Sequence, residues 1–315
     1  MLLVTGAAGF IGSNVIAGLN AQGRTDIIAV DDVESGNDFK NLVGKCFADY
    51  LDFRVLCDNR RYPKLKHLDG IIHLGAIADT QATSGRLLME NNFTFSKRMV
   101  WLAEANKCPL VYASSASVYG DGHRGFQENA ENEHPKSPYA FSKWVFDQYV
   151  RQLATTRALR WSAPITGLRY FNVYGPGEAH KGSMSSFPYK CLIAALEGRP
   201  IELFEGSTSF TRDLIYISDV VAITLFFLSA KTSGIFNVGT GEAVSFAHIA
   251  DTATKLCGAE TIVIPFPEQM RAGYQAHTQA DITKLRVAGW ANPFTSIEDG
   301  IRDYWQHVKH DKEGY

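Results

Sequence analysis

Two side chains that could oxidise an alcohol, Tyr139 and Lys143, lie four positions apart. On a helix this spacing places both on one face, where the ammonium can lower the pKa of the phenol toward neutrality. Such a phenol can remove a proton from an alcohol while a redox cofactor takes hydride from the same carbon. The pair also occurs on ordinary solvated helix faces, so it predicts a dehydrogenase site only when a cofactor motif accompanies it.

A cofactor motif stands near the start of the sequence. Gly6, Gly9 and Gly12 follow an apolar strand pattern at residues 2–5 and open a helical pattern at residues 11–19. Glycines at this spacing allow a sharp turn, close approach of the backbone to a pyrophosphate and tight packing of helix on strand. The strand, the helix and the acids after the next strand favour a dinucleotide-binding loop over an ordinary glycine-rich turn.

The acids that follow the second strand pattern bear on the choice of cofactor. Asp31 is expected to accept hydrogen bonds from the adenosine ribose, with Asp32 beside it. Together with Glu34 and Asp38 they would repel a 2′-phosphate, so the local charge favours NAD over NADP. Asp49 would contact the adenine amine or would be a plain loop acid, and the sequence leaves both open.

Alternating strand and helix patterns must position these residues. Further strand patterns occur at residues 27–30, 70–74, 110–113 and 165–169, with helical patterns between them. This alternation predicts an α/β fold with a Rossmann-type, doubly wound parallel sheet. After residue 177 the pattern changes to shorter pieces punctuated by proline and glycine, which predicts a smaller, mixed α/β C-terminal substrate domain. The predicted division is a dinucleotide-binding domain, 1–172 with 213–238, and a substrate-binding domain, 173–212 with 239–315.

Ser115 follows the strand pattern that ends at Ala113, so it lies at the carboxyl edge of the predicted sheet, where such folds bind ligands. It is the candidate to bind a substrate hydroxyl beside Tyr139. The alternative role for an isolated serine here is to cap the next turn.

Composition narrows the partners and the compartment. The 315 residues are 45% hydrophobic with a formal net charge of -2 and no basic stripe, which argues against nucleic acid and membrane partners. Five cysteines without CxxC spacing argue against a disulfide framework and a metal site. No basic segment precedes the first strand, so we expect no signal peptide and a cytoplasmic location.

Four ordered motifs together resemble the extended short-chain dehydrogenases/reductases that act on nucleotide sugars. They are residues 5–12, residues 112–120, Tyr139 with Lys143, and residues 169–176. Further segments are similar to the ADP-L-glycero-D-manno-heptose 6-epimerases, namely residues 177–185, 203–207, 212–213, 234–241, 264–267 and 274–281. His180-Lys181-Gly-Ser-Met184 discriminates most, because generic nucleotide-sugar epimerases lack it.

This resemblance implies an isomerase that inverts C6″ of ADP-D-glycero-D-manno-heptose through a transient ketone, with one tightly bound NAD or NADP per subunit. It also implies a role in making the lipopolysaccharide inner core and a homo-oligomer, commonly a pentamer. Lys143 would orient the nicotinamide ribose. Lys181 would reach the substrate from the side opposite Tyr139 as a second acid/base; without the family it reads as a surface cation.

The resemblance also implies binding residues. For the cofactor they are Gly6, Gly9, Phe10, Ile11, Gly12, Asp31, Asp32, Asp49, Leu74, Gly75, Ala76, Ile77, Ala78, Asn91, Lys143 and Val173. For the substrate they are Ser115, Asn172, Ser183, Lys190, Phe204, Glu205, Gly206, Ser207, Arg212 and Tyr274.

Three of these positions need comment. Arg212 suits a diphosphate because its planar fork donates two hydrogen bonds at once, the alternative being a surface ion pair with Asp213. Asp38 stands where the family has a lysine that meets the 2′-phosphate of NADP. The local charge therefore favours NAD, whereas the family resemblance implies NADP. Lys190 stands where the family has a histidine, so one hydrogen-bond donor to phosphate replaces another.

Three alternative functions follow from the same residues. A UDP-hexose 4-epimerase would share every motif except the His180-Lys181 loop. A 4,6-dehydratase would need an Asp-Glu pair after Ser115, where Ala116 and Ser117 stand. A cofactor-sensing protein without catalysis could use the same fold, but it would have little reason to keep the serine, tyrosine and lysine together.

Overall fold

The computed structural model describes residues 1–33, 38–58, 65–156, 162–268 and 274–313. Its large sheet consists of parallel strands β1 (Leu2–Thr5), β2 (Ile27–Asp31), β3 (Asp49–Asp52), β4 (Gly70–His73), β5 (Leu110–Ser115), β6 (Ile165–Tyr170) and β10 (Gly234–Val238). Their spatial order is β10-β6-β5-β4-β1-β2-β3, so the direction of progression reverses between β1 and β4. In doubly wound sheets, ligands bind at such a reversal, beyond the carboxyl ends of the strands.

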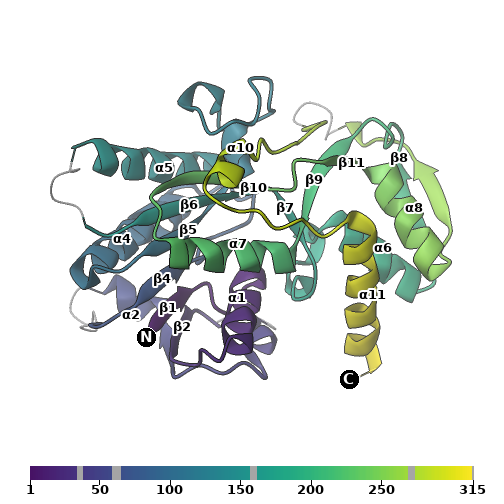
Figure 1. Ribbon diagram of the computed structural model, residues 1–315. Coiled ribbons are helices and arrows are strands. Elements are labelled where there is room, and N and C mark those ends of the chain that lie inside the picture. The colour runs from purple at the N-terminus through teal and green to yellow at the C-terminus, as the bar shows by residue number, and fades with distance from the viewer. Residues whose placement is uncertain (34–37, 59–64, 157–161, 269–273, 314–315) are drawn as a thin grey trace.

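Helices cover both faces of this sheet (Figure 1). Helices α1 (Phe10–Ala21) and α7 (Ile217–Ala230) pack on one face, and α4 (Phe95–Asn106) and α5 (Pro138–Thr156) on the other. Alternation along β1 decides the partners, because Leu2 and Val4 pack with Ile16 of α1 while Leu3 packs with Met99 of α4. Shorter helices of this lobe are η1 (Asp38–Leu42), α2 (Phe53–Cys57), α3 (Gly85–Leu88), η2 (Met89–Thr94), η3 (Ala116–Tyr119) and η4 (Ala130–Asn132).

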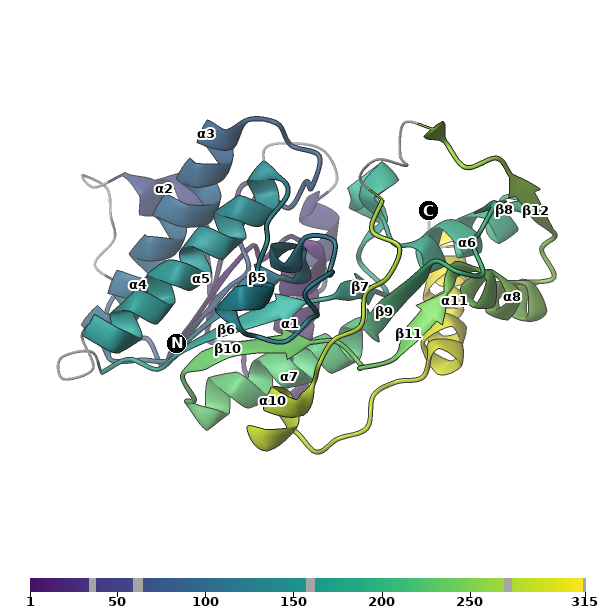
Figure 2. The same cartoon turned by 90° about the horizontal axis from the view of Figure 1, so that it is seen from above.

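The second lobe is smaller and mixed, as Figure 2 shows from above. Strands β7 (Asn172–Tyr174), β9 (Thr211–Tyr216) and β11 (Ala243–Ser245) form a sheet in the order β11-β9-β7, and β8 (Ile201–Phe204) pairs with β12 (Thr261–Ile264). Its helices are η5 (Ala179–Met184), α6 (Phe187–Leu196), α8 (Phe246–Cys257) and α11 (Ile297–Glu313), while α10 (Thr283–Val287) lies beside β10. The predicted fold class, a Rossmann-type sheet with a smaller mixed lobe, is confirmed.

The boundary predicted at residue 213 falls inside β9. This strand pairs with β7 and β11 along its length, so it belongs to the small sheet. The chain returns to the large sheet through α7 and β10. The division into two domains stays a prediction, but the return begins at Ile217 rather than Asp213.

One hydrophobic core extends through both lobes. It joins Leu168 and Phe236 of the large sheet to Leu192, Ile249 and Ile301 of α6, α8 and α11. The two lobes therefore share a continuous packed interior. Among the described helices, none is both long and apolar enough to span a bilayer.

Candidate active site

The glycine-rich loop between β1 and α1 is a close-packed backbone cradle. Gly6 has a φ of 69°, and a Cβ there would lie 2.6 Å from the backbone nitrogen of Gly75. A Cβ on Gly12 would lie 1.9 Å from the carbonyl oxygen of Gly6. The loop therefore requires glycine at both positions. Phe10 and Ile11 begin α1, whose first amide groups suit a pyrophosphate.

Asp31 ends β2 next to this loop. Its carboxylate accepts hydrogen bonds from the backbone nitrogens of Ala8 (2.7 Å) and Asp32 (2.9 Å). A cleft of about 100 Å³ opens here, lined by Thr5, Gly6, Val30, Asp31, Asp32, Phe53, Gly75, Ala76, Ile77, Asn91 and Phe95. It brings together predicted cofactor residues from separate segments, and the glycine cradle and the acid fit a dinucleotide.

Two aromatic residues of this cleft were not predicted. Phe53 begins α2 directly after β3, and Phe95 begins α4. Their rings meet edge to face with centroids 5.8 Å apart. The strand that precedes Phe53, β3, was itself not predicted, and the position of Phe95 depends on tertiary packing.

Asp49 is not brought to this cleft. It begins β3 and pairs with Ile28, whereas Asp31 at the carboxyl end of β2 pairs with Asp52. Asp49 therefore lies toward the opposite edge of the sheet, and its carboxylate accepts a hydrogen bond from the backbone nitrogen of Tyr50 (2.9 Å). Asp49 is therefore a strand residue rather than a loop acid, and its contact with the adenine amine stays a prediction.

The remaining predicted cofactor positions lie around the cleft rather than on its wall. Gly9 is the N-cap of α1, Leu74 packs against the core, Ala78 is exposed, and Val173 lies in β7. The side chain of Asp38 lies outside the described part of the structure, so the charge argument rests here on Asp31 and Asp32.

An unpredicted asparagine connects this cleft to α5, the helix of Tyr139 and Lys143. Asn92 forms two hydrogen bonds with the backbone of Ile77, of 2.8 and 3.0 Å. Its amide also donates to the Ser142 hydroxyl (3.0 Å), which donates to the carbonyl oxygen of Tyr139 (2.7 Å). Asn91, the predicted neighbour, lines the cleft while its amide donates to Leu87.

Tyr139 and Lys143 are both buried on α5. Burial raises the pKa of the Tyr139 phenol, and a hydrogen bond with Ser115 partly opposes that rise. Burial also lowers the pKa of Lys143 to about 8, which the nearby Asp147 opposes. The predicted lowering of the phenol pKa by Lys143 is wrong for this structure, because desolvation of both groups outweighs their spacing.

The lysine instead binds the sheet. The Lys143 ammonium donates to the carbonyl oxygen of Ala113 at 3.0 Å, which ties α5 to the end of β5. The Ser115 hydroxyl at that end accepts a hydrogen bond from the backbone nitrogen of Ser117 (3.1 Å). Ser115 thus caps η3, as the alternative role predicted, and also faces Tyr139.

A buried charge network holds α5 against the sheet. Asp147 of α5 accepts hydrogen bonds from the guanidinium of Arg169 (2.8 Å) and the hydroxyls of Tyr112 and Ser114 (both 2.9 Å). Arg169 also bonds to Glu133. These partners come from β5, β6 and the segment before α5, so the network fixes the helix against the strands that end at the site.

Lys181 lies at the junction between the lobes, in the short helix η5. Its ammonium is 3.4 Å from Glu178 Oε2 and 5.1 Å from the centroid of the Phe10 ring. Asn41 joins this loop to the glycine cradle by donating to the carbonyl oxygens of Ala8 (2.9 Å) and Gly177 (3.3 Å). The observed contacts of Lys181 are with this cradle side rather than with Tyr139.

Arg212 is held between two aromatic rings. Its guanidinium lies 5.3 Å from the ring centroids of both Phe246 and Tyr274, and burial lowers its pKa. The alternative ion pair with Asp213 is wrong, because that buried carboxylate accepts from backbone amides of the neighbouring loops, Thr240 and Gly241 among them. A guanidinium stacked in this way retains a planar fork for an anionic group.

The other predicted substrate residues lie at three places. Phe204 ends β8 and Glu205, Gly206 and Ser207 lie in the turn that follows. The Phe204 ring contacts Phe266 (5.3 Å), whose ring contacts Tyr274 (5.0 Å). Asn172 donates to Asp213 O and Thr278, whereas Ser183 and Lys190 lie beside the Lys181 loop, joined by a 2.8 Å bond from the Lys190 ammonium to Ser183 O.

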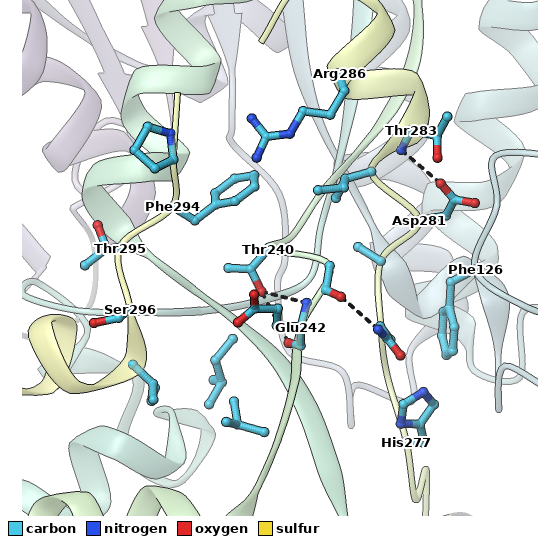
Figure 3. A pocket seen from close by; sticks show the side chains of 18 of the residues that line it. Phe126, Thr240, Glu242, His277, Asp281, Thr283, Arg286, Phe294, Thr295 and Ser296 are labelled. Atoms are coloured by element: carbon cyan, nitrogen blue, oxygen red, sulfur yellow. Dashed lines mark hydrogen bonds between the residues drawn. The ribbon is translucent and has the colours of Figure 1, made fainter. Parts of the chain in front are cut away.

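A groove larger than the cleft beside Asp31 lies elsewhere. Figure 3 shows this space of about 1200 Å³, with Thr240, Glu242, His277, Asp281, Arg286 and Phe294 on its walls. None of the predicted site residues lines it. Volume alone therefore does not locate the chemistry. Over the described residues, no cluster of three or more histidine, cysteine or acidic side chains is arranged to hold a metal ion.

Comparison with known proteins agrees with the geometry. Residues 2–239 match the model of the NAD dependent epimerase/dehydratase family. The chain is 30% identical to ADP-L-glycero-D-manno-heptose-6-epimerase of Helicobacter pylori, with a TM-score of 0.85 over 98% of this chain and 96% of that one. It is 25% identical to the UDP-glucose 4-epimerase of Thermotoga maritima, with a TM-score of 0.81 over 99% of both chains. It is 26% identical to the UDP-glucose 4-epimerase of Thermus thermophilus solved with NAD, with a TM-score of 0.78 over 98% of both. The family match spans most of the chain and includes the glycine cradle, the acid after β2 and the tyrosine–lysine helix, and the protein therefore belongs to the NAD-dependent epimerase/dehydratase family.

Proposed function

We propose that this protein is an epimerase that interconverts ADP-D-glycero-D-manno-heptose and ADP-L-glycero-D-manno-heptose at C6″. The observation that carries the proposal is the position of Lys181, a second ammonium held at the lobe junction beside the cofactor cradle, on a loop remote in sequence from Tyr139. An inversion through a ketone removes hydride from one face of the carbon and returns it to the other, so the oxygen takes two positions, and two separately positioned groups can exchange its proton there. The similarity to the Helicobacter pylori enzyme supports this substrate.

The roles of the residues follow from their places. NAD held by the glycine cradle and Asp31 would supply a hydride acceptor that also returns the hydride. Tyr139 in its phenolate form would take the proton of the C6″ hydroxyl, and Ser115, hydrogen bonded to Tyr139, would orient that hydroxyl. C6″ is exocyclic, so rotation about C5″–C6″ presents the other face of the ketone. Lys181 handles the proton on that side, and Arg212 binds the diphosphate.

Two other activities use the same fold. A UDP-hexose 4-epimerase is the second candidate, because the Thermotoga maritima and Thermus thermophilus relatives carry that name. A dehydratase is disfavoured by Ala116 and Ser117, which have no acidic group to expel water. A protein that only senses its cofactor is disfavoured by the contact between Ser115 and Tyr139, which serves a substrate hydroxyl.

The substrate is tested by incubating the purified protein separately with each ADP-heptose epimer and with UDP-galactose. The proposal expects interconversion of the two ADP-heptoses and no conversion of UDP-galactose. Conversion of UDP-galactose alone would establish the 4-epimerase instead. Light scattering on the same preparation tests the proposed homo-oligomer, for which family resemblance suggests a pentamer.

For the cofactor we propose NAD rather than NADP. Asp31 and Asp32 lie at the cleft where the adenosine ribose would bind, and two carboxylates there repel a 2′-phosphate. Denatured protein should release mostly NAD, identified by chromatography against both standards. Release of mostly NADP would contradict the charge argument but would leave the epimerase proposal standing.

A further inference from the structure

Glu178 is a fully buried carboxylate in the loop that carries Lys181. Its two oxygens accept from the Ser186 hydroxyl (2.6 Å), the Ser186 backbone nitrogen (2.7 Å) and the Gly175 backbone nitrogen (3.3 Å). The Tyr304 hydroxyl of α11 contributes a longer contact of 3.4 Å. The charge therefore has neutral donors from three segments before Lys181 is considered.

The Lys181 ammonium adds a fifth partner, 3.4 Å from Oε2. The lysine side chain is 29% exposed, so its long, flexible chain could extend into solvent at little cost. Instead, the ammonium is held between the carboxylate on its own loop and the ring of Phe10 on the glycine cradle, 5.1 Å away. Two lobes thus define the position of one ammonium.

Stability alone gives little reason for this arrangement. An ion pair that is buried on one side loses solvation that its attraction repays only partly, so such pairs seldom add much stability. What the carboxylate does provide is a fixed location for the positive charge. The other cation that faces Glu178 is Lys190, whose ammonium is bound to the carbonyl oxygen of Ser183.

We propose that Glu178 is a positioning residue for Lys181: its buried carboxylate holds the ammonium at the lobe junction, where it serves one of the two faces of the substrate carbon. This inference rests on the proposed epimerase function. Glu178 does not touch the substrate or the cofactor in this scheme and acts only through Lys181. Its loss should therefore impair one half of the reaction and spare the half that depends on Tyr139.

The test uses purified holoenzyme and follows the absorbance of reduced nicotinamide in a single turnover, after addition of each ADP-heptose epimer separately. Lys181→Met should lose cofactor reduction from one epimer by at least about 100-fold, the scale of general acid/base catalysis. Glu178→Gln should slow cofactor reduction by the same epimer about 10- to 100-fold, the scale of a misplaced group. Its rate of cofactor reduction by the other epimer should stay within about twofold of wild type.

Glu178→Asp is the second variant, because it keeps a buried negative charge but withdraws the carboxylate by one methylene from all its partners, the Lys181 ammonium included. It should show the same selective loss at a smaller size. Ser296→Ala is the control for a purely structural defect, since Ser296 caps α11 in the same lobe through the backbone nitrogen of Asp299 (3.1 Å). It should lower the melting temperature and leave both epimers unaffected.

Suppose that wild-type protein epimerises ADP-heptose. If the two Glu178 variants then reduce cofactor equally slowly with both epimers, or as fast as wild type with both, the positioning role is overturned. Wild-type protein that responds to neither ADP-heptose would overturn the proposed function and this inference together.

Discussion

Tyr139 and Lys143 illustrate how far a residue's surroundings change its chemistry. Their spacing suggests an ammonium that lowers the pKa of a phenol. Both groups are buried, however, and desolvation raises the pKa of Tyr139 and lowers that of Lys143, which favours the neutral form of each. His73 behaves in the same way, because burial and the nearby Lys143 lower its pKa to about 3. It therefore stays neutral and links Thr5 (2.6 Å) to Ser96 (2.8 Å) beneath the cleft.

Lys143 should leave a signature in the pH dependence of stability. Its pKa is about 8 in the fold against 10.5 ordinarily, so between these values the unfolded chain binds more protons than the folded one. This group therefore makes the wild-type free energy of unfolding rise with pH from about 8 to 10.5. The Lys143→Met variant lacks this pH-dependent contribution. Its free energy of unfolding, compared with that of wild type, should therefore fall by about 3 kcal/mol as the pH rises from about 8 to 10.5.

Urea unfolding of both proteins at several pH values measures this difference, and the comparison cancels the other groups that titrate in the same range. A difference that does not vary with pH would show that Lys143 has its ordinary pKa in the folded protein.

At the scale of elements, the turn from β1 into α1 depends on contacts between backbones. A methyl group on Gly12 would meet the carbonyl oxygen of Gly6 at 1.9 Å, and neither backbone can yield without moving the helix. Gly12→Ala should therefore lower the free energy of unfolding by at least about 2 kcal/mol and reduce bound cofactor. Gly85→Ala is the matched control, because nothing lies within 4 Å of its added methyl group.

Urea unfolding and the cofactor content of purified protein measure the outcome. Gly85→Ala should stay within about 0.5 kcal/mol of wild type. Equal stability and cofactor content in the two variants would show that the turn relaxes around a side chain.

Strand β9 positions Arg212 between the rings of Phe246 and Tyr274. Arg212→Lys keeps the charge but loses the planar fork and the stacking, so KM for the nucleotide sugar should rise about tenfold with kcat within about threefold of wild type. Arg286→Lys is the matched control, since Arg286 also stacks on a ring, Phe294 at 4.8 Å, outside the predicted site.

Steady-state kinetics with the proposed ADP-heptose substrate decide between the two arginines. An unchanged KM for Arg212→Lys, or an equal rise for Arg286→Lys, would remove Arg212 from the diphosphate site.

At the scale of the whole molecule, the two lobes share one core. Leu168 and Phe236 of the large sheet pack in the same cluster as Ile249 and Ile301 of the small lobe. Asp213 adds a polar link, because its buried carboxylate accepts from the backbone nitrogen of Ala280 (2.9 Å) in the C-terminal segment. Neither lobe can lose its packing without exposing the interior of the other.

The protein should therefore unfold in one cooperative transition despite its two lobes. Differential scanning calorimetry should give a calorimetric enthalpy equal to the van't Hoff enthalpy, and added NAD should raise the melting temperature without splitting the peak. Two resolved transitions would show that the lobes are energetically independent.

Local patterns in the sequence were enough to predict the fold class, the glycine cradle, the acid after β2 and the tyrosine–lysine helix. These features depend on alternation of elements, glycine spacing and helical periodicity, which act between residues close together in the chain.

The remaining features of the site depend on the folded chain. Strand register moved Asp49 away from the cleft and left Asp31 at it. Packing between distant segments placed Phe95 and Asn92 at the cofactor site, surrounded Arg212 with rings and gave Glu178 its partners. Burial then set the pKa values of Tyr139 and Lys143. Register, long-range contacts and desolvation all arise from residues far apart in the chain, so no local pattern can specify them.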